Sequence, residues 1–142
     1  MLTLAIIKPD AVAAGHTGKI LAHLEEAGFS IRAARLVRLT IAQAEAFYAV
    51  HRERPFFRSL VTFMTSGPAL ALALKRDGAV AVLREAIGAT DPAEARAGTI
   101  RKLYAQSKER NAIHASDSAE NAAREVGFFF TEAELAELFR TS

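Results

Sequence analysis

Four short apolar segments, separated by stretches of helical periodicity, constrain the fold of this chain most strongly. These strand-like segments are residues 2–7, 29–39, 69–74 and 112–114. The first ends at Lys8-Pro9-Asp10, where proline forbids continuation of a central strand. Strands in this order with helices between them predict an α+β sandwich of the ferredoxin-like, split βαβ type, with a four-stranded antiparallel sheet and helices packed on it.

The intervening segments carry helix signals. Thr40 with Gln43 reads as a capping box that opens one helix, and Asp117 with Glu120 reads as the cap of another. Further helices are expected over 18–27, 57–64 and 79–87, and Phe128–Phe130 should close the last helix. Residues 69–74 alternate Ala and Leu with a period of two although both residues favour helices, and we interpret them as a strand. Residues 89–111 show little periodicity and are expected to be a long functional loop.

Composition restricts the class of protein. The 142 residues are 51% apolar and 24% charged, a balance typical of one globular domain, expected over 1–142. The net charge of +2 comes from scattered basic residues, which makes nucleic-acid binding unlikely but suits a site for a small polyanion. The absence of cysteine excludes disulfide scaffolds, thiolate zinc sites and cysteine nucleophiles.

The sequence also predicts a cytoplasmic location. The apolar run at the N-terminus is too short for the core of a signal peptide. No segment approaches the roughly 20 apolar residues of a membrane span.

Three alternative sites do not fit the residues present. Gly15-His-Thr-Gly18-Lys19-Ile20 looks like a phosphate loop, but Ala13 and Ile20 stand where that motif needs glycine and a hydroxyl residue. A hydrolase triad of His114, Ser116 and Asp117 fails because residues this close on a tight turn point in different directions. A zinc site fails because His114 has no second histidine nearby.

His114 is the candidate nucleophile among four histidines. His16, His23 and His51 occupy positions typical of solvated or packed residues, whereas His114 ends a strand and precedes a polar helix start that favours anions. Neutral imidazole is a good nucleophile near pH 7, and a carboxylate on its far nitrogen would fix the tautomer. Glu125, at the edge of the apolar face of the following helix, is the candidate carboxylate.

The segment Asn111-Ala-Ile-His114-Ala-Ser116-Asp117-Ser118 resembles the active-site signature of nucleoside diphosphate kinases. Other family-like blocks occur in family order, so that the resemblance covers nearly the whole chain. They are Lys8-Pro9-Asp10, Phe47-Tyr48, Arg54-Pro55-Phe56-Phe57, Met64-Thr-Ser-Gly67-Pro68, Gly88-Ala-Thr90-Asp-Pro92 and Gly98-Thr-Ile-Arg101.

The resemblance implies transfer of the terminal phosphate from a nucleoside triphosphate to a nucleoside diphosphate. The transfer would be ping-pong, through a phosphohistidine on His114, with low base specificity. The resemblance also implies a role for each site residue. Glu125 orients His114, and Tyr48 lies beside His114. Lys8 and Asn111 contact the ribose hydroxyl and phosphates, Arg84, Thr90 and Arg101 bind the phosphates around Mg²⁺, and Phe56, with Leu60 behind it, stacks on the base. The implied Mg²⁺ is held mainly by nucleotide phosphates rather than by protein ligands.

This sequence departs from the family pattern at Ala115, where glycine is usual, and at Lys108, where a smaller apolar residue often covers the other face of the base. The resemblance implies a homo-oligomer. Pro92 and its loop favour a hexamer, while the early end at Ser142 leaves a tetramer open.

Two rival functions share some of these features. A ferredoxin-like regulatory or nucleic-acid-binding module needs no buried nucleophile, so the pairing of His114 with Glu125 together with Arg84 and Arg101 separates it from the enzyme. A histidine phosphatase or phosphocarrier would share His114 but would not need Phe56 to stack on a base.

Overall fold

A computed structural model describes residues 1–139 of the chain. Its four strands form one antiparallel sheet in the order β2-β3-β1-β4, which confirms the predicted fold. The strands are β1 Leu2–Ile7, β2 Ser30–Val37, β3 Ala69–Lys75 and β4 Ile113–Ala115. The two central strands, β1 and β3, are buried over almost their whole length.

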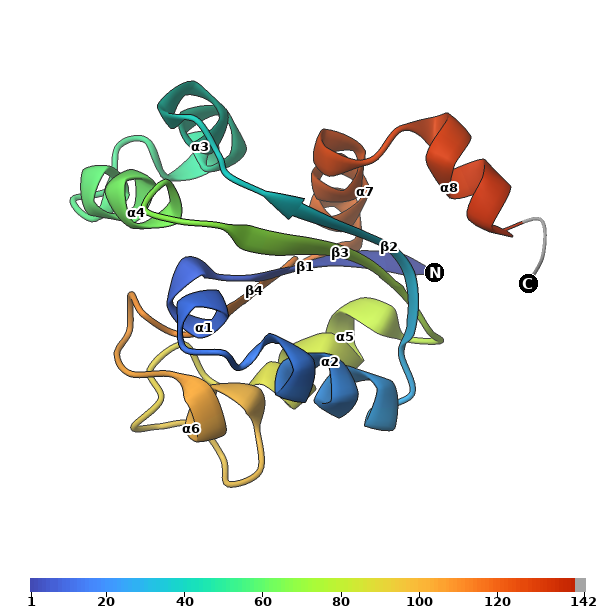
Figure 1. Ribbon diagram of the computed structural model, residues 1–142, viewed down its shortest axis with the longest axis horizontal. Coiled ribbons are helices and arrows are strands. Elements are labelled where there is room, and N and C mark those ends of the chain that lie inside the picture. The colour runs from blue at the N-terminus through green and yellow to red at the C-terminus, as the bar shows by residue number, and fades with distance from the viewer. Residues whose placement is uncertain (140–142) are drawn as a thin grey trace.

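Helices cover both faces of this sheet (Figure 1). One layer comprises α3 (Ile41–Phe47), α4 (Phe57–Met64), α7 (Ala119–Phe129) and α8 (Glu132–Phe139). The opposite layer comprises α1 (Pro9–Ala13), α2 (Thr17–Glu26), α5 (Ala79–Ile87) and α6 (Ile100–Tyr104), and a 3₁₀ turn, η1 (Ala49–His51), follows α3.

Each strand of the sheet divides its side chains between two hydrophobic cores. In β1, Leu4 and Ile6 belong to the core under α3, α4 and α7, whereas Ala5 and Ile7 belong to the core under α2 and α5. This division follows from the alternation of side chains along a strand. It explains why the period of residues 69–74 prevails over their helical propensity, because their alanines and leucines face different cores.

Two predicted helix starts have different outcomes. The capping box at Thr40 is present, with Gln43 N donating to Thr40 Oγ1 and Thr40 N donating to Gln43 Oε1. The cap predicted at Asp117 is wrong by one residue, because Ser118 Oγ accepts from Asn121 N at 3.1 Å. Asp117 instead accepts from the Asn121 side chain.

The sequence prediction missed the helices α1, α6 and α8. Pro9 begins α1 in a position that suits proline, whose missing N–H costs nothing there. The five residues of α6 are too few to show periodicity, although Thr99 caps them from within the expected loop. For α8, the overlooked signal is a capping box, in which Thr131 Oγ1 accepts from Glu134 N at 3.0 Å.

No helix within residues 1–139 is long and apolar enough to cross a membrane. The expectation that concerns Ser142 lies outside the described residues.

The packing of Gly88 against Thr99 yields a stability prediction. Gly88 ends α5 with φ of 86°, and a Cβ there would lie 2.5 Å from Thr99 Oγ1. Gly88→Ala should therefore lower the free energy of unfolding by about 1–3 kcal/mol, from left-handed strain and overpacking together. Urea denaturation measures this change.

Gly127→Ala is the matched control, because Gly127 lies in α7 with open space around it. Alanine there should stabilise the protein by about 0.5–1 kcal/mol. Equal unfolding midpoints for the two variants would contradict the packing described at Gly88.

Candidate active site

His114 lies at the centre of the short strand β4, opposite Ile6 of β1. Its neighbours Ile113 and Ala115 belong to the core under α2 and α5, so its own side chain points to the other face of the sheet, beneath α3 and α7. There the imidazole meets two aromatic rings edge-on, with centroid distances of 5.3 Å to Phe47 and 6.1 Å to Tyr48. The fold thus places Tyr48 beside His114, as expected.

A buried carboxylate from α7 holds the ring of His114. Glu125 Oε1 lies 2.7 Å from His114 Nε2, and the two side chains are 8% and 19% exposed. The same oxygen accepts a hydrogen bond of 2.8 Å from the fully buried Ser116 Oγ. With Nε2 occupied by Glu125 and no described residue bonded to Nδ1, Nδ1 is the ring nitrogen left for chemistry.

Burial controls the protonation of this pair. It lowers the pKa of His114 below the ordinary 6.5, Lys8 and Arg101 lower it further, and the opposing effect of Glu125 is smaller. Burial alone would raise the pKa of Glu125, but its bonds from His114 and Ser116 and the nearby Arg124 outweigh that effect and lower it. The pair is therefore a neutral imidazole that donates from Nε2 to a carboxylate at pH 7.

Three cations from separate parts of the chain lie near His114. Lys8 Nζ donates to Asn111 Oδ1 at 2.8 Å, at the end of the sheet where β1 stops. Arg101 of α6 donates to the carbonyls of Gly88 and Ile113 at 3.1 and 2.8 Å. Arg84 of α5 donates to the carbonyl of Ala115 at 3.3 Å.

None of these three cations forms an ion pair with a carboxylate of residues 1–136, whose side chains the structure describes. Burial and the charge of Arg101 lower the pKa of Lys8 to about 8, and burial and the charge of Arg84 lower that of Arg101 to about 10. Both remain mainly protonated at pH 7. Arg101 Nε and Tyr48 Oη are also buried without a hydrogen-bond partner among the described residues. A bound polyanion would offset the positive charge of the three cations and accept hydrogen bonds from them.

The backbone just before His114 adopts a rare conformation. Ala112 has φ of 74°, the only positive φ of a non-glycine residue within 1–139. Ile113 N donates to the Asn111 carbonyl at 2.9 Å, which makes residues 111–113 a γ-turn of the rare, strained form. Such a turn costs of the order of 1–3 kcal/mol and persists only where its surroundings enforce it. Asn111 Nδ2 also reaches the carbonyl of Thr90 at 3.4 Å.

The residues expected at the base lie farther from His114. Phe56, the N-cap of α4, is 46% exposed, and its ring contacts His51 at a centroid distance of 5.4 Å. His51 stacks in turn on Tyr48, so that aromatic rings run from His114 to Phe56. Leu60 packs against the core under α4, and Lys108 is exposed.

Sequence reasoning missed three residues of this site. Ser116 entered only as a member of a rejected triad, yet it bonds Glu125. His51 was interpreted only as solvated or packed, and its ring packs between Tyr48 and Phe56. Asp10 accepts from the backbone N–H of Ala112, and its place directly after the first strand, in the block Lys8-Pro9-Asp10, was the signal that could have indicated it.

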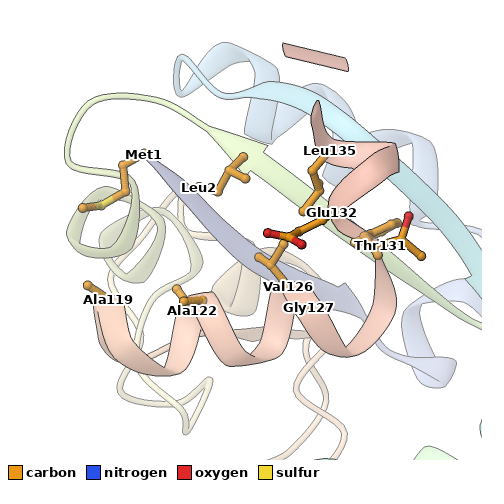
Figure 2. Close-up of a pocket in the computed structure, with 11 residues that line it drawn as sticks. Met1, Leu2, Ala119, Ala122, Val126, Gly127, Thr131, Glu132 and Leu135 are labelled. Atoms are coloured by element: carbon orange, nitrogen blue, oxygen red, sulfur yellow. The ribbon is translucent and has the colours of Figure 1, made fainter. Parts of the chain in front are cut away.

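Two surface hollows differ in chemistry. One of about 480 Å³ is polar, with two arginines, Arg84 and Arg96, and two glutamates, Glu85 and Glu94, in its lining. Another, of about 550 Å³, is lined mainly by apolar residues of β1, α7 and α8. Figure 2 shows Leu135 and Glu132 on one side of it and Ala122 and Val126 of α7 on the other. No group of three or more potential metal ligands occurs within residues 1–139.

Comparison with known proteins places this geometry in a family. The family model for nucleoside diphosphate kinase matches residues 2–135. The nucleoside diphosphate kinase of Legionella pneumophila is 56% identical over 134 residues, which cover 94% of this chain and 95% of that protein. The protein of the same name from Sorangium cellulosum is 54% identical, with coverage of 94% and 93%.

Solved structures agree in fold. The nucleoside diphosphate kinase of Aquifex aeolicus superposes with a TM-score of 0.92 at 48% identity, covering 94% of this chain and 96% of that one. The halophilic enzyme of Halobacterium salinarum, solved in complex with CDP, gives 0.90 at 36% identity, with coverage of 94% and 90%. The chain therefore belongs to the nucleoside diphosphate kinase family.

Proposed function

We propose that this protein is a nucleoside diphosphate kinase that transfers a terminal phosphate between nucleotides through a phosphohistidine on His114. The observation that carries the proposal is geometric: the His114 ring is held by Glu125 at Nε2, beside three cations that form no ion pair with a carboxylate placed in the structure. A regulatory module has no use for a buried, oriented nucleophile. A phosphocarrier protein would not need the run of rings that ends at the exposed Phe56.

The chemistry is a displacement at phosphorus in each half-reaction. His114 Nδ1 attacks the terminal phosphorus of the donor, a P–N bond forms, and the P–O bond to the departing nucleoside diphosphate breaks. The imidazole gains positive charge, which the Glu125 carboxylate stabilises while Nε2 keeps its proton. After the diphosphate leaves, an acceptor diphosphate attacks the same phosphorus and the sequence runs in reverse.

Lys8, Arg84 and Arg101 would neutralise the phosphates during both half-reactions. Phosphoryl transfer depends mainly on positioning and charge neutralisation, and arginine offers a fork of donors that matches phosphate oxygens. Asn111 and Thr90, which are joined by the contact between Asn111 Nδ2 and the Thr90 carbonyl, would complete the ribose and phosphate contacts. Tyr48 keeps its proton, because burial and the charge of Glu125 raise its pKa.

Magnesium would enter as part of the nucleotide complex. Mg²⁺ retains waters and binds substrate phosphates with few protein ligands, which fits a site where the described residues form no cluster of three or more potential metal ligands. The bound ion supplies neutralisation of phosphate charge.

The proposal extends to the base and to assembly. Phe56 and Leu60 would receive the base, and the structure of a relative with CDP supports a nucleotide as the ligand. We propose a single domain over 1–142 that acts in the cytoplasm and forms a homo-oligomer, with a hexamer favoured. Leu36 on the edge strand β2 is 64% exposed, and a second copy would cover such an apolar strand edge.

Intact-mass analysis tests the phosphohistidine. Incubation with ATP and magnesium should add one acid-labile, base-stable phosphoryl group per chain, and His114→Ala should abolish the addition. His23→Ala, which removes a histidine on the opposite layer, should still be phosphorylated. An unchanged mass of the wild-type protein would disprove the mechanism.

Glu125→Gln tests the role of the carboxylate. The amide can still accept from Nε2 but cannot stabilise the developing positive charge, so phosphorylation should slow by about 10- to 1000-fold. Rapid-quench kinetics measures the rate, and circular dichroism should show an unchanged fold. Glu120→Gln, on the exposed first turn of the same helix, should react at the wild-type rate, and equal rates for all three proteins would refute the assignment.

The exposed ring of Phe56 predicts weak discrimination among bases. ATP, GTP, CTP and UTP should serve as donors with kcat/KM values within about 100-fold, because stacking of about 1–3 kcal/mol is available to any base. Lys108→Val should change KM modestly and leave kcat unchanged.

His51 is the polar residue nearest to that ring, and its removal by His51→Phe provides the control. The order of donors should persist in this variant, since a hydrogen bond at a half-exposed site competes with water. A preference of the wild-type protein above about 10³-fold for one nucleotide donor over another would contradict the prediction, because it would show that a buried hydrogen-bond partner recognises the base edge.

A further inference from the structure

The strained turn at Ala112 joins two residues of the proposed site. Asn111, immediately before it, contacts Lys8, and His114 follows two residues after it. Alanine has no intrinsic preference for the left-handed region, so contacts from elsewhere in the fold must hold φ at 74°.

Those contacts come from one short segment, residues 8–10. Asp10 Oδ2 accepts a hydrogen bond of 3.1 Å from the N–H of Ala112, and Lys8 N donates to the Ala112 carbonyl at 2.8 Å. Both polar groups of the Ala112 backbone are therefore tied to the end of β1 and the start of α1. The Lys8 bond continues the pairing of β1 with β4, whereas the Asp10 bond is a side-chain contact added to the ladder.

Asp10 is suited to hold this turn. Its side chain belongs to a residue that is only 8% exposed, so water competes weakly for the Ala112 N–H. Its other oxygen, Oδ1, has no hydrogen-bond partner among the described residues. Among the described residues the carboxylate therefore accepts one hydrogen bond, and that bond comes from the strained residue.

We propose that Asp10 is a positioning residue for phosphoryl transfer: it holds the Ala112 turn, and through the turn it fixes Asn111 and His114. The inference rests on the proposed function, because it takes His114 as the nucleophile. Asp10 would act without touching the nucleotide. Without its contact the turn can relax, and β4 with His114 would shift away from the line of attack. A misplacement of about 1 Å can slow such a reaction by about 100-fold.

A different role for Asp10 would be purely electrostatic. Its charge partly opposes the effects of burial and Arg101 that lower the pKa of Lys8, so its loss could act through Lys8. Asp10→Asn separates the two roles, because the amide oxygen can keep the contact with Ala112 N while the charge is removed. Asp10→Ala removes both.

Rapid-quench measurement of phosphoenzyme formation from magnesium ATP is the test. Asp10→Ala should slow the reaction by about 10- to 100-fold, and Asp10→Asn should stay within about fivefold of wild type. Asp77→Ala, which removes an exposed carboxylate, should match wild type. Equal loss in both Asp10 variants would overturn the proposal in favour of charge, and no loss in either would overturn it outright.

A second substitution distinguishes positioning from general destabilisation. Glycine adopts a positive φ without strain, so Ala112→Gly should restore about fivefold or more of the rate lost in Asp10→Ala, and should itself react at nearly the wild-type rate. A double variant as slow as Asp10→Ala would contradict the proposal. If wild-type protein forms no phosphoenzyme, the proposed function fails; if only the Asp10 variants behave unexpectedly, the inference about Asp10 fails alone.

Discussion

The contact between His114 Nε2 and Glu125 Oε1 is the interaction on which the rest of the site depends. It joins β4, only three residues long, to the longest helix of the described chain. The 2.7 Å hydrogen bond occupies Nε2, and burial lowers the pKa of the ring, which favours its neutral form at pH 7. A short strand on its own would hold a side chain loosely. Here the sheet fixes the backbone of His114 and the helix fixes its ring, which is the rigidity that positioning of a reacting atom requires.

The three cations are available to bind a ligand because none of them is paired with a described carboxylate. Lys8, Arg84 and Arg101 come from a strand end, a helix and a short helix of the opposite layer, and each is held by backbone carbonyls or an amide oxygen rather than by a carboxylate. Burial first, and then repulsion from the neighbouring arginine, lowers the pKa values of Lys8 and Arg101. A fold that maintains this repulsion without a ligand is arranged for a polyanion, because binding relieves it.

Sequence patterns predicted the strands and helices that periodicity indicates. They failed where the backbone adopts a conformation that its residues do not favour. The alternation in β3 and the cap at Thr40 predicted elements correctly, and spacing along α7 indicated that Glu125 could reach β4. The turn at Ala112 was not predictable, since alanine carries no signal for a positive φ. The roles of Ser116 and His51 depend on contacts across elements, which a single sequence does not display. The helix α6 was not predicted because its five residues are too few to show helical periodicity.

The state of the His114 ring tests the account most directly. Nitrogen-15 NMR of histidine-labelled protein at pH 7, with His114→Ala to assign the signals, reports which ring nitrogen carries the proton. The account predicts a neutral His114 ring with the proton on Nε2 and a bare Nδ1, and a titration midpoint below 6.5. A ring protonated on Nδ1, or doubly protonated at pH 7, would contradict it, because Nδ1 could then not attack phosphorus.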